Sequence, residues 1–278
     1  MTHKRLQIQT TDGVPASDGA GVRMTRVIGN SQFDHIDPFL LLDVFKSDNP
    51  DDYIAGFPSH PHRGFETVTY MFAGQMRHKD NAGNEGVIEA GGVQWMTAGR
   101  GIVHSEMPEQ QDGLMWGTQL WVNLPASDKM TEPGYQEFAA ADIPQEERAG
   151  DVSVRVIAGT TGNGTEGAVR DRPTEPMYFD VSLPAGANFV ETIPESHNAI
   201  LFVVEGAVRI DDTDVAASST AILNGLSAIN VAGSESPSRF LLIAARRLQE
   251  PIARGGPFVM NTEQELRQAF HDYQTGNF

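Results

Sequence analysis

The chain has 278 residues, enough for two domains of ordinary size, and its 40% hydrophobic content is typical of a globular protein. Its net charge of −17 disfavours direct binding to nucleic-acid phosphates, and the absence of cysteine excludes disulfides and thiolate metal ligands. No stretch approaches the roughly 20 apolar residues that cross a bilayer, and no apolar segment follows the basic start, so we expect a cytoplasmic protein without a membrane partner.

Short strand-like runs dominate the chain. They are rich in Val, Ile, Tyr, Phe and Thr, and Gly, Pro or Asn-Gly usually marks their ends. Many short strands with frequent turn signals are typical of sandwiches and barrels, so we predict an all-β protein. The predicted strands are residues 66–72, 94–97, 114–124, 152–158, 177–183, 199–204, 221–223 and 240–244.

A polar, charged stretch at residues 142–151, bracketed by Pro and Gly, predicts a linker between two domains. Each half contains an apolar run that ends in a glycine turn, at residues 68–74 and 200–206, which suggests a duplication. We therefore expect an N-terminal domain over residues 1–141, a second domain over 142–250, and a tail over 251–278.

The tail contains the one predicted helix. Thr262 and Glu265 fit the capping box S/T-x-x-E, which marks a helix start. The residues that follow place apolar side chains on one face, so we expect this helix to pack back on the domains. That face consists of Leu266, Ala269, Phe270 and Tyr273.

Two segments of the N-terminal half concentrate potential metal ligands. His60 and His62 lie two residues apart in the first, and His104 and Glu106 lie two residues apart in the second. Side chains at i and i+2 of a strand point to the same face, so each pair can converge on one ion. If neighbouring strands carry the two pairs inward, four ligands meet inside a barrel.

Such a set leaves coordination positions open for a substrate or O2. Three nitrogens and a carboxylate suit one divalent metal, either Fe(II) or Mn, Ni, Cu or Zn. Glu66 has the same parity as His60 and His62 and would also face inward, unless Gly64 breaks the phase of the strand.

The remaining histidines lack a paired partner. We expect the second half to bind no metal, because His197 stands alone there. His3 and His271 lie near the termini and are expected to be solvated, and His35 and His78 lie in polar, turn-like contexts.

The words HPHRGFETV at residues 60–68 and QWMTAGRGIVHSEMPE at 94–109 resemble the signature of the pirin family within the cupin superfamily. Further segments resemble the family at residues 37–43, 78–83, 119–125 and 256–262. The resemblance implies two tandem cupin barrels of the jelly-roll type with a short C-terminal helix, and a metal-free second barrel. It implies a metal, usually iron, held by His60, His62, His104 and Glu106. Glu66 lies outside this set, and we expect it to hydrogen-bond to the ligands, with direct ligation as the alternative.

Three functions follow from this resemblance. The first is a quercetin 2,3-dioxygenase-like enzyme, which would cleave a flavonol-like aromatic substrate with O2, with Glu106 as the possible general base. The second is a regulatory protein that senses iron or redox state and binds a protein partner. The third is a metal site that only stabilises the barrel.

Overall fold

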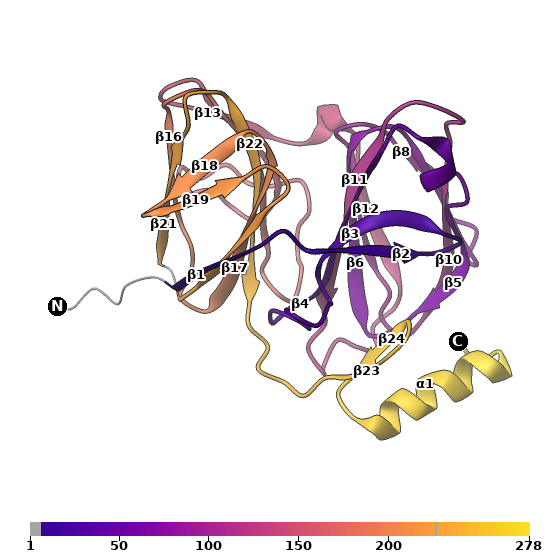
Figure 1. Ribbon diagram of the computed structural model, residues 1–278. Coiled ribbons are helices and arrows are strands. Elements are labelled where there is room, and N and C mark those ends of the chain that lie inside the picture. The colour runs from indigo at the N-terminus through magenta and orange to yellow at the C-terminus, as the bar shows by residue number, and fades with distance from the viewer. Residues whose placement is uncertain (1–6, 226) are drawn as a thin grey trace. The chain divides into compact units, whose positions relative to one another are not determined.

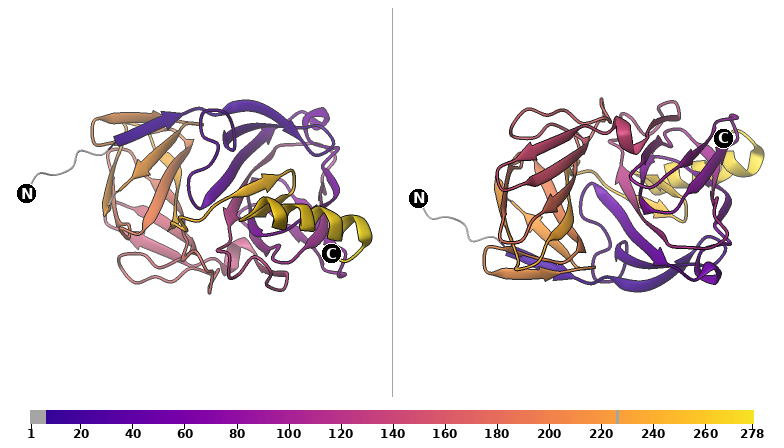
Figure 2. Two further views of the ribbon diagram at one scale, coloured as in Figure 1. Left: turned by 90° about the horizontal axis from the view of Figure 1, so that it is seen from below. Right: turned by 90° about the horizontal axis from the view of Figure 1, so that it is seen from above.

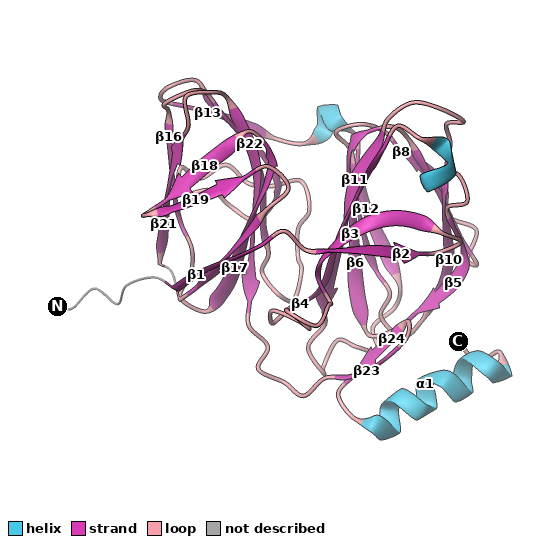
Figure 3. Cartoon of the chain, in the orientation of Figure 1, coloured by secondary structure: helices cyan, strands magenta, loops and turns pink. Residues whose placement is uncertain are grey.

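The computed structural model describes residues 7–225 and 227–278. Strands make up most of this part of the chain, which divides into two compact units (Figure 3). The first unit contains residues 14–140 and 248–278, and the second contains residues 141–247 together with the described residues up to 13. No helix in the described ranges is long and apolar enough to cross a membrane.

The first unit contains two antiparallel sheets. The larger has the strand order β12-β9-β6-β11-β4-β3-β2, and the smaller has the order β5-β10-β7-β8 (Figure 1). The strands are β2 (Val14–Asp18), β3 (Val22–Ile28), β4 (Phe39–Ser47), β5 (Phe57–His62), β6 (Phe65–Ala73), β7 (Met76–Asp80), β8 (Glu85–Ile88), β9 (Val93–Thr97), β10 (Ile102–Pro108), β11 (Met115–Asn123) and β12 (Gly134–Phe138). Two 3-10 turns, η1 (Pro50–Asp52) and η2 (Ala140–Asp142), lie between strands.

Apolar side chains from both sheets meet between them. Phe45 and Met71 extend from the larger sheet, and Met76 and Ile88 extend from the smaller one into the same buried cluster. Strand β10 alternates buried and partly buried residues, as expected for a strand with one face toward the core between two packed sheets.

The second unit repeats this plan. Its seven-stranded sheet has the order β1-β20-β17-β22-β15-β14-β13, and its four-stranded sheet has the order β16-β21-β18-β19. The strands are β1 (Gln7–Thr11), β13 (Gln145–Arg148), β14 (Val152–Ala158), β15 (Met177–Leu183), β16 (Asn188–Thr192), β17 (His197–Glu205), β18 (Ala207–Ile210), β19 (Thr213–Ala216), β20 (Thr220–Asn224), β21 (Ala228–Gly233) and β22 (Ser238–Arg246). Phe179, Phe189 and Phe240 pack in its core. The all-β prediction is confirmed, and each predicted strand is present.

The predicted linker is not simply a linker. Residues 145–148 within it form strand β13, which pairs with β14 from Gln145↔Arg155 to Arg148↔Val152. The sequence did not predict this strand because its residues are polar. Its buried residue, Glu146, is stabilised by hydrogen bonds and not by apolar contacts. Thr161 Oγ1 and Asn163 Nδ2 donate to Glu146 at 2.5 and 2.8 Å.

The C-terminal segment completes the first unit. Strands β23 (Ala253–Gly255) and β24 (Phe258–Met260) pair with each other, and helix α1 (Glu263–Thr275) lies beside them (Figure 2). The predicted capping box is present, since Thr262 Oγ1 accepts from Glu265 N and Glu265 accepts from Thr262 N. Leu266 and Ala269 are buried, whereas Phe270 and Tyr273 are partly exposed and touch the Phe258 ring.

A buried lysine ties this segment to the barrel. Lys129 is 1% exposed, and its Nζ donates to Gly64 O at 2.8 Å, Asn123 Oδ1 at 2.7 Å and Val259 O at 3.0 Å. These three acceptors satisfy all three ammonium hydrogens, which makes the burial of the charge tolerable.

Candidate metal centre

Neighbouring strands carry the histidines of the two ligand pairs. β5 pairs with β10 in antiparallel register, with His60 opposite His104 and His62 opposite Ile102. The register shifts between His104 and Glu106, which lies opposite Phe57. The i, i+2 spacing therefore places His60 and His62 on one face, next to His104.

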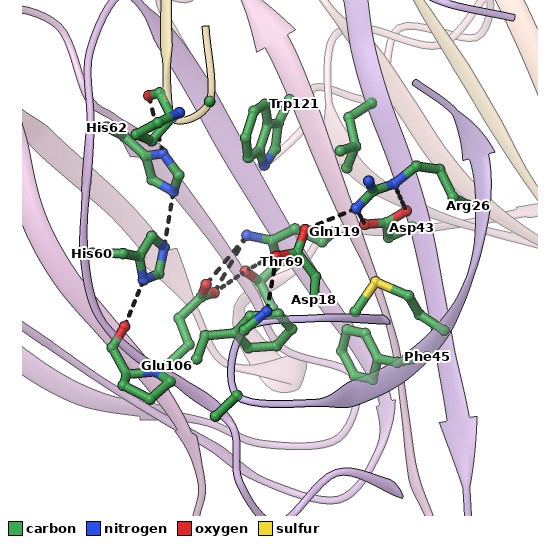
Figure 4. Close-up of a pocket in the computed structure, with 18 of the residues that line it drawn as sticks. Asp18, Arg26, Asp43, Phe45, His60, His62, Thr69, Glu106, Gln119 and Trp121 are labelled. Atoms are coloured by element: carbon green, nitrogen blue, oxygen red, sulfur yellow. Dashed lines mark hydrogen bonds and ion pairs between the residues drawn. The ribbon is translucent and has the colours of Figure 1, made fainter. Parts of the chain in front are cut away.

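The three imidazoles form a compact group in the first unit. Their ring centroids lie 4.5 to 5.1 Å apart, and one nitrogen of each lies within 4.8 Å of the others. His62 and His104 are buried and His60 is partly buried. Figure 4 shows the rings of His60 and His62 facing each other at the edge of a pocket. A group of this size could hold a metal ion.

Hydrogen bonds select the tautomer of two of these rings. His60 Nδ1 lies 2.8 Å from Pro58 O, and His62 Nδ1 lies 3.4 Å from Pro257 O. These carbonyls require a hydrogen on each Nδ1, which leaves a lone pair on each Nε2. The two Nε2 atoms lie 3.0 Å apart. Two lone pairs at this distance repel each other unless they share a proton or a metal ion, so the arrangement fits a metal.

The third histidine fits a metal for a separate reason. Both ring nitrogens of His104 are buried, and neither has a hydrogen-bond partner among the described residues. A buried nitrogen without a partner is costly, and coordination would satisfy it. Burial lowers the pKa of His104 to about 4, and burial together with the neighbouring imidazoles lowers the pKa of His62 well below its ordinary range. Both rings are thus neutral at pH 7, the form that binds metals.

Glu106 lines the same pocket but is not a member of the compact group of nitrogens. Its Oε1 lies 3.0 Å from Thr69 Oγ1, and both of its carboxylate oxygens lie 3.4 Å from Gln119 Nε2. Figure 4 shows the carboxylate between His60 and this Thr69–Gln119 pair. Glu106 therefore has a defined orientation near the histidines.

Glu66 lies apart from the pocket. The extended strand that contains His60 and His62 is interrupted at Gly64, which has φ +87°. Only glycine fits there, since a Cβ would lie 2.0 Å from Val259 O. Strand β6 therefore restarts with a new phase at Phe65. The Glu66 side chain is fully buried, and its Oε1 accepts from Thr97 Oγ1 at 2.7 Å. It is not among the residues that line the pocket.

The pocket has a volume of about 660 Å³, within the usual range of small-molecule sites. Aromatic and charged side chains share its wall. They include Phe45, Phe57, Trp121, Asp18, Arg26, Asp43 and Arg254. The Trp121 ring lies 5.1 Å from the His62 ring and 4.4 Å from the Phe65 ring. Trp121 therefore forms an aromatic part of the pocket wall beside His62.

His78 is placed differently from the prediction. It lies in strand β7 rather than in a turn, is 4% exposed, and stands opposite Glu106 on β10. Its Nε2 lies 2.7 Å from Glu137 Oε2, and its ring lies 5.6 Å from that of Tyr135. The partly buried Arg77 and the exposed Lys79 gave this strand its polar, turn-like composition. The inward residues His78 and Asp80 are polar as well, so no apolar alternation in the sequence marked the strand.

The other histidines lie away from the group of three. His35 is exposed, with Nδ1 3.0 Å from Asp34, and His271 is exposed on α1. His197 is buried in the second unit, where its Nε2 lies 2.8 Å from Glu175 O and its Nδ1 lies 3.0 Å from Ser196 Oγ. His3 lies outside the described residues.

Two β-barrels of the cupin type in one chain, one of them with a buried group of histidines, define a bicupin. Family models agree with this class: the Pirin model matches residues 21–122, and the model of the pirin C-terminal cupin domain matches residues 178–278. The chain belongs to the pirin family.

Similar proteins extend over the whole chain. A pirin-like protein of Caulobacter vibrioides is 53% identical over 274 residues, which cover 99% of both chains. A Pseudomonas aeruginosa protein with the provisional name quercetin 2,3-dioxygenase is 50% identical over 282 residues, with 99% of both chains covered. The crystal structure of a quercetin 2,3-dioxygenase from Acinetobacter baumannii superposes with a TM-score of 0.86 at 35% identity, covering 96% of this chain and 95% of that one.

Proposed function

We propose that this protein is a metal-dependent dioxygenase that cleaves flavonol-type aromatic substrates with O2. In this proposal His60, His62, His104 and Glu106 hold one divalent metal, Fe(II) in preference to Mn, Ni, Cu or Zn. The observation that carries it is the compact group of three imidazoles at the wall of an aromatic pocket, in which the His60 and His62 Nε2 atoms lie 3.0 Å apart and both His104 nitrogens are buried without a partner among the described residues. The likeness to relatives named quercetin 2,3-dioxygenase supports the substrate class.

The protein's own residues would bind, orient and deprotonate the substrate. Trp121 would stack on the planar rings and direct a hydroxyl toward the histidines. Glu106 would accept the proton of that hydroxyl, since Thr69 and Gln119 hold its carboxylate in place. A bound metal would supply Lewis acidity that lowers the pKa of the hydroxyl, together with reactivity toward O2. The pocket wall would exclude water from the ionised substrate.

Metal binding and turnover can be measured together. The iron-loaded protein should consume quercetin in air and release carbon monoxide, measured against free iron as control. His62→Ala and His104→Ala should each lose most of the bound metal and the activity, because each removes a nitrogen of the compact group. His197→Ala should keep both, because the hydrogen bonds of His197 lie in the second unit.

Two results would contradict the proposal. Equal metal loss in all three variants would show that the ligand assignment is wrong. Stoichiometric iron without carbon monoxide release would instead favour the regulatory function, in which the iron site senses redox state and a protein partner reads it.

A further inference from the structure

One cation of the pocket wall has no carboxylate partner in the described part of the chain. Arg254, on β23, donates from Nη1 to Leu40 O at 3.1 Å, and its guanidinium carbon lies 5.1 Å over the Trp121 ring. Arg26, the other arginine of the wall, is neutralised. It donates to both oxygens of Asp43 at 2.9 and 2.7 Å and to Asp18 at 2.9 Å.

Arg254 therefore has N–H donors available for a ligand at the edge of the pocket. A guanidinium has five N–H donors in a planar fork, and Leu40 O occupies one of the two on Nη1. Such a fork matches the two oxygens of a carboxylate, and its hydrogen bonds to an anion are stronger than those between neutral groups. Because Arg254 is only partly exposed, its charge is less screened than that of a surface arginine.

Trp121 links this cation to the candidate metal centre. The centroid of the indole ring lies 5.1 Å from that of the His62 ring and 5.1 Å from the guanidinium carbon of Arg254. Because the pocket wall includes the histidines and Arg254, an aromatic molecule in the pocket beside Trp121 could approach the histidines at one end and the arginine at the other.

We propose that Arg254 determines specificity by selecting aromatic substrates that carry an oxyanion, a carboxylate or an ionised phenol, at the end remote from the hydroxyl that approaches the histidines. This inference rests on the proposed function for the orientation of the substrate. It narrows the substrate class from planar hydroxylated aromatics to acidic ones. The charges of Asp34, Asp43 and Asp18 act on Arg254 from a distance, but no carboxylate of the described residues forms an ion pair with it, so its guanidinium remains available to an anionic molecule.

Two naphthalenes test the proposal by binding alone. 2-Naphthol has the hydroxyl only, and 6-hydroxy-2-naphthoate adds a carboxylate at the opposite end. Their dissociation constants are measured with the metal-loaded protein under argon, by calorimetry and by quenching of tryptophan fluorescence. We expect the wild-type protein to bind the naphthoate about 10-fold more tightly, a preference that weakens with added salt.

The variants isolate the guanidinium. Arg254→Gln should remove the preference while keeping 2-naphthol binding, and Arg254→Lys should keep part of it, since the charge remains but the fork is lost. Arg209→Gln, which removes an arginine paired with Asp214 on the surface of the second unit, is the matched control and should change nothing.

Equal wild-type affinities for the two probes would overturn the proposal, and so would a preference that survives Arg254→Gln. A parallel loss of both probes in Arg254→Gln would show that the arginine only supports the Trp121 wall. If Arg254→Gln does not fold, the proposal is tested by the affinities of the wild-type protein for the two probes and by the reduced preference expected of Arg254→Lys. Because no turnover is measured, absence of carbon monoxide release defeats the proposed function without affecting this test.

Discussion

Thr69 cannot satisfy both of its polar neighbours at once. Its hydroxyl oxygen lies 2.6 Å from Gln119 Oε1 and 3.0 Å from Glu106 Oε1, yet the hydroxyl has one hydrogen to donate. If it donates to Gln119, the Gln119 amide hydrogens remain directed at Glu106. Glu106 therefore keeps at least one donor whichever way the Thr69 hydroxyl points, and this holds its carboxylate in place.

Substitution can separate the two tasks assigned to Glu106. Glu106→Gln keeps an oxygen of similar reach but removes the proton acceptor, so metal content should fall modestly while flavonol turnover falls by about 100-fold or more. Glu66→Gln should have a smaller effect, because Glu66 bonds to Thr97 outside the pocket. Iron stoichiometry and carbon monoxide release measure the two quantities. A wild-type rate for Glu106→Gln at full iron loading would reject the role of base and leave the ligand assignment intact.

Helix α1 and the residues after it contact both segments that supply the histidines. Arg63, next to His62, donates from Nε to Arg100 O and from Nη1 to Asp272 on α1 at 2.7 Å. Phe278 lies against Gly101, where a Cβ would lie 2.9 Å from its ring, and the Arg63 guanidinium stacks on that ring at 4.6 Å. The end of the chain therefore braces the turn after β5 and the loop before β10.

Removing this brace should destabilise the first unit. The Arg63 side chain is 4% exposed and that of Asp272 is 20% exposed, so Asp272→Ala leaves a buried guanidinium without its carboxylate. The free energy of unfolding should fall by about 1.5–3 kcal/mol, the range for hydrogen bonds to charged groups. Urea denaturation followed by circular dichroism measures it. Asp214→Ala breaks the exposed pair with Arg209 and should have little effect, so equal losses in the two variants would contradict the role given to Arg63.

Several strands with a long apolar run could be predicted from the sequence, but β3 and β4 were not among the predicted strands although buried apolar residues recur in both. The run that forms β17 is apolar along most of its length. The spacing of His60 and His62 placed both on one face of β5, and the pairing of β5 with β10 brings His104 beside them. Strand β13 was missed since all four of its residues are polar. Arg254 was missed because its place beside Trp121 depends on a long-range contact that no local pattern records.

Across the molecule, low pH should reduce the free energy of unfolding of the second unit through the carboxylate of Glu146. Burial raises the pKa of Glu146, but hydrogen bonds from Thr161, Thr165, Arg148 and Asn163 outweigh this and hold it at about 2. Since the unfolded value is near 4.5, the folded state binds fewer protons between these values. The stabilisation is therefore complete above pH 4.5 and is lost as the pH falls toward 2.

Glu146→Gln should lower the melting temperature at pH 7 and flatten its decline between pH 4.5 and 2. Thermal unfolding across this pH range is the measurement. Glu147→Gln provides a control on the same strand, because Glu147 is exposed. A decline in Glu146→Gln as steep as in the wild-type protein would show that other carboxylates govern acid unfolding.

Neither unit is continuous in sequence. Strand β1 pairs with β20 in the second unit, and residues 248–278 supply β23, β24 and α1 to the first. On the ribosome, the first strand must therefore wait for some two hundred residues before its partner emerges. The first unit lacks the lysine acceptor Val259 and the Asp272 brace until residues 259 and 272 have been translated. A stop codon placed before residue 259 should therefore impair the barrel formed by residues 14–140.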